Sequence, residues 1–237
     1  MPELSVVIPV YNEAAFVEPA ARELCAALDQ RHLDYEVLLC ENGSKDATPE
    51  AISRIEAAHP RVRHLKIGEP NYGKAMRAGI LAAEGTFVVC DEIDLCFVEQ
   101  FYDHALPMLR AVGGPDMVVG SKAMRDAHDD RPPLRRAATL ILNGLLRIVL
   151  GFRGTDTHGV KAFRRARLLP VAMACVVDRD LFASEFVIRA SRMDRRVEEI
   201  PLSLHEKRPP SIHLFKRVPR VLKSLVKLFW VIRIRHR

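Results

Sequence analysis

Short apolar runs alternate with longer amphipathic segments along the first half of the chain. Runs rich in β-branched residues predict buried strands at 4–10, 35–40, 62–67, 86–91 and 117–121. The segments between them carry apolar residues at helical spacing, as in the stripe formed by Phe16, Ala20, Leu24 and Leu28. Strands that alternate with helices of about 10–15 residues indicate βαβ units. We therefore expect an α/β fold with a mostly parallel sheet flanked by helices.

The pattern changes after about residue 123. Residues 125–136 are charged and contain two prolines, which predicts a surface loop. The segment 151–165 is basic and punctuated by glycines, and no helix or strand is assigned to it. Beyond the loop, the pattern predicts helices at 134–150, 182–193 and 214–235, and a strand at 197–204.

Polar side chains follow three of the predicted strands where each strand ends. The segments are PVYNE (9–13), ENGSKDAT (41–48) and DEID (91–94). Ligands of parallel sheets bind beyond the carboxyl ends of the strands, so the three clusters are expected to converge on one edge. Each cluster also has a purely structural interpretation, in which it caps a following helix through Asn12, through Asp46 or Thr48, and through Asp91.

Glu92 and Asp94 stand two positions apart, just past a predicted strand. In extended backbone such residues point to the same side. Two carboxylates on one side form a hard, oxygen-rich site that suits Mg²⁺ or Mn²⁺. Mg²⁺ is usually held by one or two protein carboxylates plus substrate phosphates, which fits this sparse set. The alternative is a solvated acidic loop without a metal.

The positive charge of the chain is concentrated at its C-terminal end. Of the net charge of +6, residues 207–237 supply ten Lys or Arg and no acid, which leaves 26 basic and 30 acidic side chains in residues 1–206. Such asymmetry suggests an anionic surface as partner. The segment 214–234, which includes Trp230, has an apolar stripe opposite Lys216, Arg220, Lys223 and Lys227. An anionic membrane surface suits this helix, and 134–150 is a second candidate.

The alternative for both helices is ordinary packing within the domain. Nucleic acid is disfavoured as a partner, because the basic stretch has little aromatic interleaving. Five cysteines without a CxxC pair indicate reduced thiols in a cytosolic protein. The sequence shows no signal-peptide pattern and no apolar stretch of about 18 residues. We expect a cytoplasmic protein, peripheral on the inner face of a membrane, with its oligomeric state open, a homo-oligomer included.

Several segments occur in an order that resembles family 2 glycosyltransferases of the GT-A fold. They are SVVIPVYNE, ENGSKDATPE, NYGKAMRAGI, the acidic motif, VVGSK, DTHGVKAFRR and RRVEEIPLSLHEKRPPS. The resemblance covers roughly residues 4–211 and is greatest to the dolichol-phosphate mannose synthase type, which moves a sugar from a nucleotide to a polyprenyl phosphate. It implies a GT-A domain over 1–211, with a nucleotide-binding half (1–122) and an acceptor half (123–211), followed by a basic amphipathic helix at 212–237.

The resemblance also implies roles by position. Substrate or nucleotide binding is implied for Pro9, Tyr11, Glu13, Glu41, Asn42, Lys74 and Lys207. The metal motif falls on Glu92 and Asp94, and basic contacts to phosphate fall on Lys161, Lys207 and Arg208. Asn42 and Glu92 stand where the family usually has aspartate, and Cys96 stands where the synthases tend to have glutamine.

The implied reaction is an inverting, metal-dependent transfer from a nucleotide-sugar. Its transition state resembles an oxocarbenium ion, and cations stabilise the departing diphosphate. A phosphate acceptor needs no strong general base, whereas a saccharide or small-molecule hydroxyl does. Glu185 in FASEF is the candidate general base if the acceptor is a hydroxyl. The alternative is that Glu185 is an acid on the surface of a helix with no catalytic role. A third hypothesis is a catalytically degenerate membrane-surface binding protein with the same fold.

Overall fold

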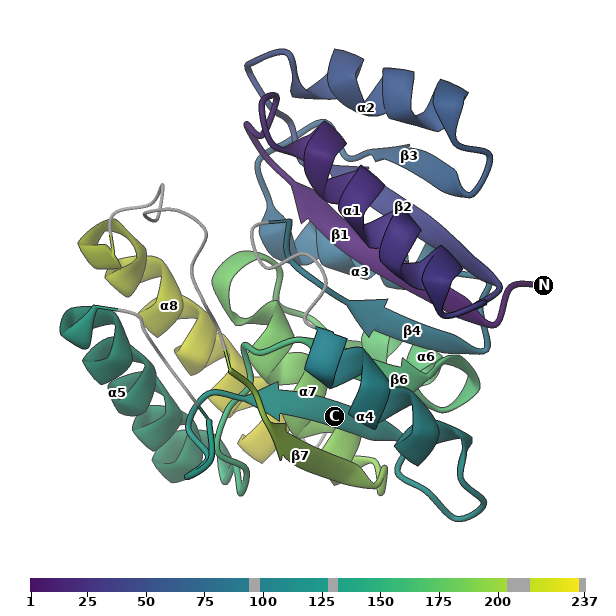
Figure 1. Cartoon of the computed structure of the whole chain (residues 1–237). Coiled ribbons are helices and arrows are strands. Elements are labelled where there is room, and N and C mark those ends of the chain that lie inside the picture. The colour runs from purple at the N-terminus through teal and green to yellow at the C-terminus, as the bar shows by residue number, and fades with distance from the viewer. Residues whose placement is uncertain (94–98, 128–131, 204–213, 235–237) are drawn as a thin grey trace.

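A single seven-stranded sheet forms the centre of the molecule (Figure 1). The structure, a computed structural model, describes residues 1–93, 99–127, 132–203 and 214–234. The strand order is β3-β2-β1-β4-β6-β5-β7. In chain order the strands are β1 (Leu4–Val10), β2 (Tyr35–Glu41), β3 (Val62–Lys66), β4 (Phe87–Cys90), β5 (Met117–Ser121), β6 (Lys161–Arg164) and β7 (Val197–Pro201). The predicted α/β fold with a mostly parallel sheet is confirmed.

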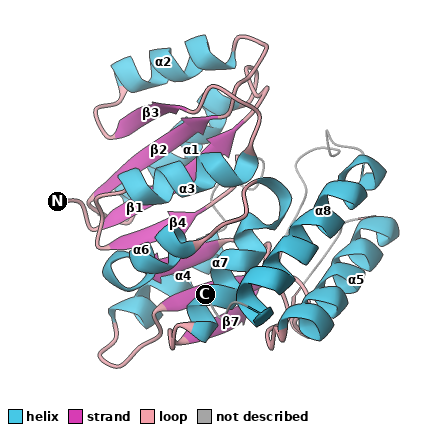
Figure 2. Ribbon diagram, turned by 180° about the vertical axis from the view of Figure 1, so that it is seen from behind, coloured by secondary structure: helices cyan, strands magenta, loops and turns pink. Residues whose placement is uncertain are grey.

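Helices cover both faces of this sheet (Figures 1 and 2). One face packs against α1 (Val17–Gln30), α2 (Thr48–Ala58) and α4 (Glu99–Arg110). The other packs against α3 (Tyr72–Ala82), α6 (Arg165–Ala174) and α7 (Phe182–Arg192). Strand residues alternate between the two cores, with Val6 and Ile8 in the first and Val7 in the second. Because both faces are covered, the strands read as continuous apolar runs.

Close packing of α3 on the sheet depends on Gly79. A methyl group in place of its hydrogen would lie 2.2 Å from Val7 Cγ1 and 2.7 Å from Cys40 Sγ. Any larger residue would push α3 away from β1 and β2. α3 begins at the sheet edge where the polar clusters lie. The close contact at Gly79 therefore also determines how near the start of α3 lies to the ends of the strands.

β6 and α6 are the elements that the sequence pattern did not predict. β6 has only four residues and begins with a lysine, so it lacks the apolar run that marks the other strands. It lies between β4 and β5 and is antiparallel to both. As a result, β6 begins at the edge of the sheet where β4 ends.

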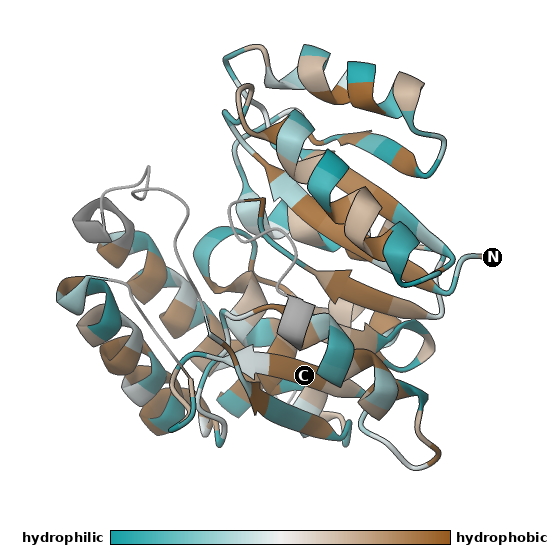
Figure 3. Cartoon of the chain, viewed as in Figure 1, coloured by the Kyte–Doolittle hydropathy of each residue, from teal (hydrophilic) through white to brown (hydrophobic). Residues whose placement is uncertain are grey.

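α5 (Pro133–Leu150) and α8 (Leu214–Leu228) contact each other and extend beyond the sheet at one side of the molecule (Figures 1 and 2). α8 continues into the π-helical turn η2 (Phe229–Ile234). Leu146 and Leu150 of α5 are buried, as are Leu225 and Leu228 of α8 and Ile232 of η2. Other apolar side chains of these helices are exposed, among them Ile141, Ile148, Leu222 and Val226. Figure 3 shows this hydrophobic colouring along both helices, outside the sheet. Among the described residues, no helix is both long and apolar enough to cross a membrane.

Candidate active site

The carboxyl ends of β1, β2 and β4 meet at one edge of the sheet. Val10 of β1 is in register with Glu41 of β2, and Val7 lies beside Cys90 of β4. The residues that follow these strands therefore share one edge, as the sequence predicted. This edge is the candidate active site.

The first two clusters are locked to each other by hydrogen bonds between their loops. Asn12 Oδ1 accepts from the Lys45 backbone N–H at 2.8 Å, and the Asn12 N–H donates to Ser44 Oγ at 3.0 Å. The Glu13 N–H donates to Thr48 Oγ1 at 2.7 Å. The expectation that Asn12 caps the first helix is wrong, because α1 begins at Val17 and Asn12 instead adopts a left-handed conformation (φ 55°) that turns its amide toward the second loop.

Asp46 and Thr48 were the two candidates for the cap of α2, and they have different roles at the start of this helix. α2 begins at Thr48, and the residue before it, Ala47, makes no side-chain cap bond. Asp46 Oδ1 accepts from both the backbone N–H and the hydroxyl of Thr48. Asp46 thus fixes the start of α2 from two residues upstream, while the Thr48 hydroxyl serves the neighbouring loop.

Glu41 and Asn42 lie buried at the end of β2. Glu41 Oε1 accepts from the Ser44 N–H at 2.5 Å, and Asn42 Oδ1 accepts from the Asn71 N–H at 2.6 Å. Each therefore shapes a loop with one atom. Glu41 Oε2 and Asn42 Nδ2 make no further hydrogen bond with the described residues, so these atoms remain for a ligand.

The other nucleotide candidates surround these two. Pro9 is buried within β1 opposite Cys40, Tyr11 is half-buried just beyond that strand, and Glu13 is buried in the first loop. Lys74 lies on the first turn of α3, where its ammonium pairs with Glu69 Oε1 at 2.6 Å in an exposed ion pair. That pairing lowers the pKa of Glu69. Lys74 is thus an exposed member of the predicted set.

The acidic motif after β4 divides into inward and outward side chains. Asp91 is fully buried and accepts from the Glu92 N–H at 2.8 Å and from the Tyr102 hydroxyl at 2.9 Å. Glu92 is half-buried at the edge, and its Oε1 accepts from the Tyr72 hydroxyl at 3.2 Å. Asp91 therefore secures α4 to the sheet, whereas Glu92 faces the site. Asp94, Cys96, Lys207 and Arg208 lie outside the described residues.

Lys161 reaches the same edge from the antiparallel strand. It is the first residue of β6, in register with Cys90, and its side chain is buried. Its Nζ donates to the Gly159 carbonyl at 2.6 Å. Burial lowers the pKa of Lys161, an effect that Cys90 and Asp156 partly offset. One small cavity is lined by residues that include Lys161, Glu92, Tyr72 and Phe182. A basic and an acidic side chain therefore line the same cavity.

A buried polar cluster behind this cavity carries residues that no sequence pattern singled out individually. Lys122 Nζ and Asp156 Oδ2 form an ion pair at 3.1 Å with both side chains buried. Although burial opposes ionisation, Lys122 and the His158 backbone N–H together bring the pKa of Asp156 to about 2. Glu199 of β7 accepts from the Thr155 N–H at 2.7 Å and from its hydroxyl. In the sequence, the signal that pointed to Asp156 and its neighbours was the segment DTHGVKAFRR, which resembles the family as a whole and not residue by residue.

His158 is held neutral within this cluster. Its Nε2 lies 3.2 Å from the Asp180 carbonyl, which can only accept, so Nε2 carries the proton. Nδ1 then accepts from the Thr157 hydroxyl at 3.0 Å. Burial lowers the pKa of His158 to about 4. The loop between α5 and β6 is therefore fixed by the Lys122–Asp156 ion pair and the neutral imidazole of His158.

Glu185 is buried in α7, so its interpretation as a helix-surface acid is wrong. Its carboxylate accepts from the Val176 and Val177 backbone N–H groups at 2.7–2.9 Å and from Arg189 Nε at 2.6 Å. These bonds tie α7 to the segment after α6. Its role as a general base stays a prediction, with both oxygens already accepting hydrogen bonds.

The donor set at the edge fits a hard divalent cation. Glu92 offers carboxylate oxygens in the lining of a small cavity, and Mg²⁺ in proteins is usually held by one or two carboxylates plus substrate phosphates. Among the described residues, no group of three or more His, Cys, Asp or Glu side chains is arranged to hold a metal alone. Glu92 is the described residue that would hold Mg²⁺ or Mn²⁺, together with Asp94 beyond it.

An open α/β sheet with its polar clusters at the carboxyl edge defines a Rossmann-like ligand-binding protein. A profile described as Glycosyl transferase family 2 matches residues 5–170. The chain therefore belongs to glycosyl transferase family 2.

Solved structures with the same fold include glucosyl-3-phosphoglycerate synthase of Mycobacterium tuberculosis. One, in complex with Mn²⁺, UDP-glucose and phosphoglyceric acid, has a TM-score of 0.65 at 19% identity and covers 94% of this chain and 79% of that chain. Another, with phosphoglyceric acid alone, has a TM-score of 0.67 at 17% identity and covers 97% and 79%. At such identities the likeness concerns the fold, and it confirms the predicted GT-A architecture.

Curated relatives match nearly the whole chain. Glycosyltransferase AglD of Haloferax volcanii is 29% identical over 99% of this chain and 38% of its own length. Dolichyl-phosphate beta-glucosyltransferase ALG5C of Trichomonas vaginalis is 28% identical over 84% and 63%. Undecaprenyl-phosphate 4-deoxy-4-formamido-L-arabinose transferase of Aeromonas hydrophila is 32% identical over 86% and 60%. The chain thus spans less than two thirds of each of these proteins.

Proposed function

We propose that this member of glycosyl transferase family 2 is a metal-dependent, inverting glycosyltransferase, and that it moves a sugar from a nucleotide-sugar to a polyprenyl phosphate or a related lipid-linked acceptor. The observation that carries the proposal is the meeting of Glu92 and Lys161 in one cavity at the carboxyl edge of the sheet. Relatives named for dolichyl-phosphate and undecaprenyl-phosphate transfer support the choice of acceptor.

The nucleotide binds in the half formed by residues 1–122. Glu41 Oε2 and Asn42 Nδ2 are placed to hydrogen-bond the base or ribose, with Pro9, Tyr11 and Glu13 beside them. Lys74 exchanges its exposed partner Glu69 for a ligand oxygen. Since exposed ion pairs contribute little, that exchange costs little.

Glu92 and Asp94 would hold the divalent cation, whose positive charge would stabilise the departing diphosphate. Lys161 contributes a second positive charge from inside the protein, where low dielectric strengthens its attraction to phosphate. Lys207 and Arg208 supply further contacts to phosphate. A basic group in such a closed site contributes about 3–4 kcal/mol to transition-state stabilisation.

The acceptor occupies the half formed by residues 123–211. A phosphate acceptor is already anionic and attacks the sugar without a general base. The bonds of Glu185 to two backbone N–H groups and to Arg189 disfavour it as a base, and so disfavour a hydroxyl acceptor. This contrast favours the phosphate acceptor over the alternative.

The membrane contact is assigned to α5 and α8. Ile141 and Ile148 of α5 are 65% and 79% exposed, and Val226 and Trp230 of α8 and η2 are 70% and 53% exposed. Exposed apolar residues beside basic ones suit the headgroup region of an anionic bilayer. The protein would then sit peripherally on the inner, cytoplasmic face, where a lipid-linked acceptor is available.

Turnover tests the proposal most simply. A panel of radiolabelled sugar nucleotides is incubated with Mn²⁺ and either a short polyprenyl phosphate or a panel of saccharides. The proposal expects sugar transfer to the polyprenyl phosphate and loss of transfer with a chelator. Transfer to saccharides alone would support the hydroxyl alternative, and an absence of transfer with intact donor binding would support the degenerate one.

A further inference from the structure

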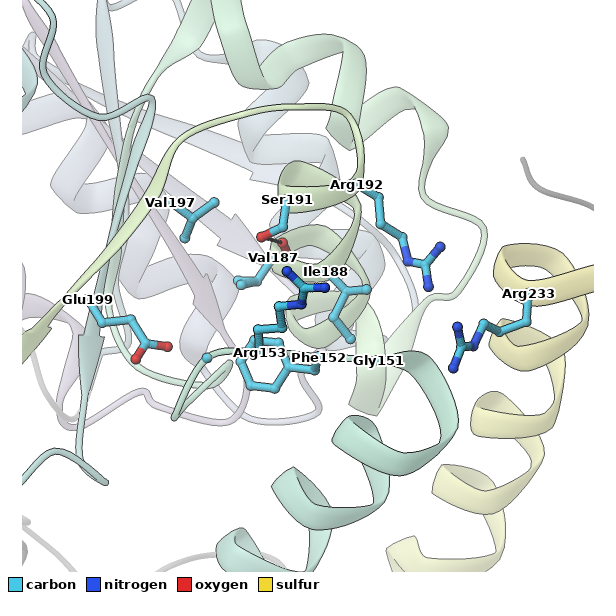
Figure 4. A pocket seen from close by; sticks show the side chains of 11 residues that line it. Gly151, Phe152, Arg153, Val187, Ile188, Ser191, Arg192, Val197, Glu199 and Arg233 are labelled. Atoms are coloured by element: carbon cyan, nitrogen blue, oxygen red, sulfur yellow. Dashed lines mark hydrogen bonds between the residues drawn. The ribbon is translucent and has the colours of Figure 1, made fainter.

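A second cavity has a volume of about 780 Å³. It is separate from the carboxyl edge of the sheet that is proposed to bind the sugar-nucleotide donor, which we call the donor edge. Its walls come from the turn after α5, the C-terminal half of α7, β7 and η2 (Figure 4). It shares no lining residue with the cavity that holds Glu92 and Lys161. The cavity with Glu92 and Lys161 touches the N-terminal half of α7, at Phe182, Ala183 and Phe186, whereas this one touches the following residues, from Val187 to Arg192.

Three arginines from three different elements surround this cavity. Arg153 follows α5, Arg192 ends α7 and Arg233 belongs to η2, and Figure 4 shows their side chains around one space. The single acid in the lining, Glu199, is already bonded to Thr155. The cavity therefore carries a net positive charge of two, with no described ion pair to any of the three guanidinium groups.

Helix capping accounts for only part of this arrangement. Arg192 Nη2 donates to the Leu150 carbonyl at 3.0 Å and Arg233 Nε donates to the Val149 carbonyl at 3.3 Å, which satisfies the C-terminus of α5. Each guanidinium has five N–H donors, so most of them remain for a ligand. Arg153 is exposed and makes no hydrogen bond or ion pair with any described residue, so its guanidinium donors remain for a ligand.

The spacing of the guanidinium groups suits a phosphate. A methyl group on Gly151 would lie 3.8 Å from both Arg192 Nη2 and Arg233 Nη1, so these nitrogens are at most twice that distance apart. A phosphate whose oxygens each accept at about 2.9 Å can bridge them. Burial lowers the pKa of Arg192, and the neighbouring charges of Arg233 and Arg189 add to this effect.

The surroundings of the cavity are apolar. Phe152, Val187 and Ile188 form a buried floor. Outside the cavity, Ile148 is 79% exposed one turn before Gly151, while Trp230 and Ile234 flank Arg233 at 53% and 50% exposure. A cationic site whose lining residues have exposed apolar neighbours in the chain suits a headgroup whose acyl chains continue into a bilayer.

We propose that the Arg153–Arg192–Arg233 cavity binds the phosphate headgroup of an anionic membrane lipid at a site separate from sugar transfer. This site rests on the membrane contact proposed for α5 and α8, but not on the identity of donor or acceptor. It would fix the orientation of the protein on the bilayer, with the donor edge a defined distance from the lipid phosphates.

Vesicle co-sedimentation with single-charge variants tests the site. Arg153→Gln removes a guanidinium without a partner in the described structure, and Arg136→Gln is the matched control, an exposed α5 arginine outside the cavity. On vesicles of phosphatidylcholine with phosphatidylglycerol, general electrostatics predicts a roughly fivefold loss for either variant. A specific site predicts at least a further tenfold loss for Arg153→Gln alone, and rescue by Arg153→Lys only in part.

Two further arms complete the test. Vesicles of phosphatidylcholine alone should bind both variants and the parent equally, and calorimetry with inorganic phosphate should show weaker binding than the anionic vesicles. Tighter binding of free phosphate than of lipid, or equal losses for the two variants, would overturn the proposal. Sugar-nucleotide binding, measured in parallel, should be unchanged in Arg153→Gln, so failure here is separable from failure of the proposed function.

Discussion

The Tyr72 hydroxyl donates a hydrogen bond to Glu92 Oε1 at 3.2 Å, joining the start of α3 to the segment that follows β4. Behind this contact, Asn71 caps α3 through the Lys74 N–H, and Asn42 holds the Asn71 N–H. The end of β2 thus positions the carboxylate beyond β4 through a short chain of bonds. Glutamate is longer and freer than aspartate, and this hydroxyl limits that freedom.

Replacing Tyr72 by phenylalanine is expected to weaken Mn²⁺-dependent donor binding about tenfold, because a hydrogen bond to a charged group contributes about 1.5–3 kcal/mol. Calorimetry with Mn²⁺ and the donor measures the change. Tyr35→Phe, which removes a hydroxyl bonded to the Cys25 carbonyl far from the site, should leave affinity unaltered. Equal affinity in Tyr72→Phe and the parent would show that Glu92 needs no such support.

Replacing Glu185 by glutamine should destabilise the fold by about 2–4 kcal/mol, because a buried acceptor of three N–H groups becomes partly a donor. Denaturant unfolding measures this loss, and Glu50→Gln on the exposed start of α2 is the control. The folded fraction should retain turnover with a polyprenyl phosphate. A folded variant with turnover reduced a thousandfold would instead identify Glu185 as the base.

Acidification should destabilise the protein through His158. The pKa of His158 is about 4 in the folded state against 6.5 for a free histidine, mainly because of burial, so the unfolded chain binds the proton more tightly. The stabilising contribution is complete above pH 6.5 and is lost as the pH falls toward 4. Between pH 7 and pH 5 the loss is about 2 kcal/mol.

Urea unfolding at those two pH values measures the loss, and His158→Gln should remove most of it. The control variant is His64→Gln, because burial also lowers the pKa of His64. This variant should retain most of the loss of unfolding free energy between pH 7 and pH 5. Below pH 4 a further decline is expected as Asp156 is protonated, because its folded pKa of about 2 lies under the ordinary 3.8. If His158→Gln lost as much unfolding free energy between pH 7 and pH 5 as the parent, the titrating group would be another residue.

Removing exposed apolar side chains from α8 should weaken membrane binding without loss of stability. Leu222 and Val226 are 49% and 70% exposed. Changing both to serine should reduce partition onto anionic vesicles at least tenfold, since burying each side chain contributes about 1.5 kcal/mol. The melting temperature should stay the same. Val112→Ser, at a fully exposed position after α4, should alter neither quantity.

Much of the donor edge could be predicted from the sequence, because parallel strands with apolar runs bring their carboxyl ends together whatever their order. β6 could not be predicted, since a four-residue strand that begins with Lys161 has no apolar run of its own and is stabilised by β4 and β5 on either side. Its antiparallel direction is what brings Lys161 to Glu92.

Side-chain partners were the other gap. The Asn12 side chain has equally good options as a helix cap and as a bridge to Lys45, and only the packing of the two loops decides between them. Glu185 reads as an exposed acid in a helix, yet the segment after α6 presents two backbone N–H groups to it. Pairs such as Lys122 with Asp156 are 34 residues apart and depend on the whole sheet.

Metal-dependent donor binding is the most direct test of the central claim. A panel of sugar nucleotides is titrated into the full chain by calorimetry, with Mn²⁺ and with a chelator, for the parent and for Glu92→Gln. The account predicts that at least one sugar nucleotide binds the parent at least tenfold more tightly with Mn²⁺, and that Glu92→Gln loses this difference. Donor binding that is indifferent to Mn²⁺, or an undiminished Mn²⁺ effect in Glu92→Gln, would contradict it.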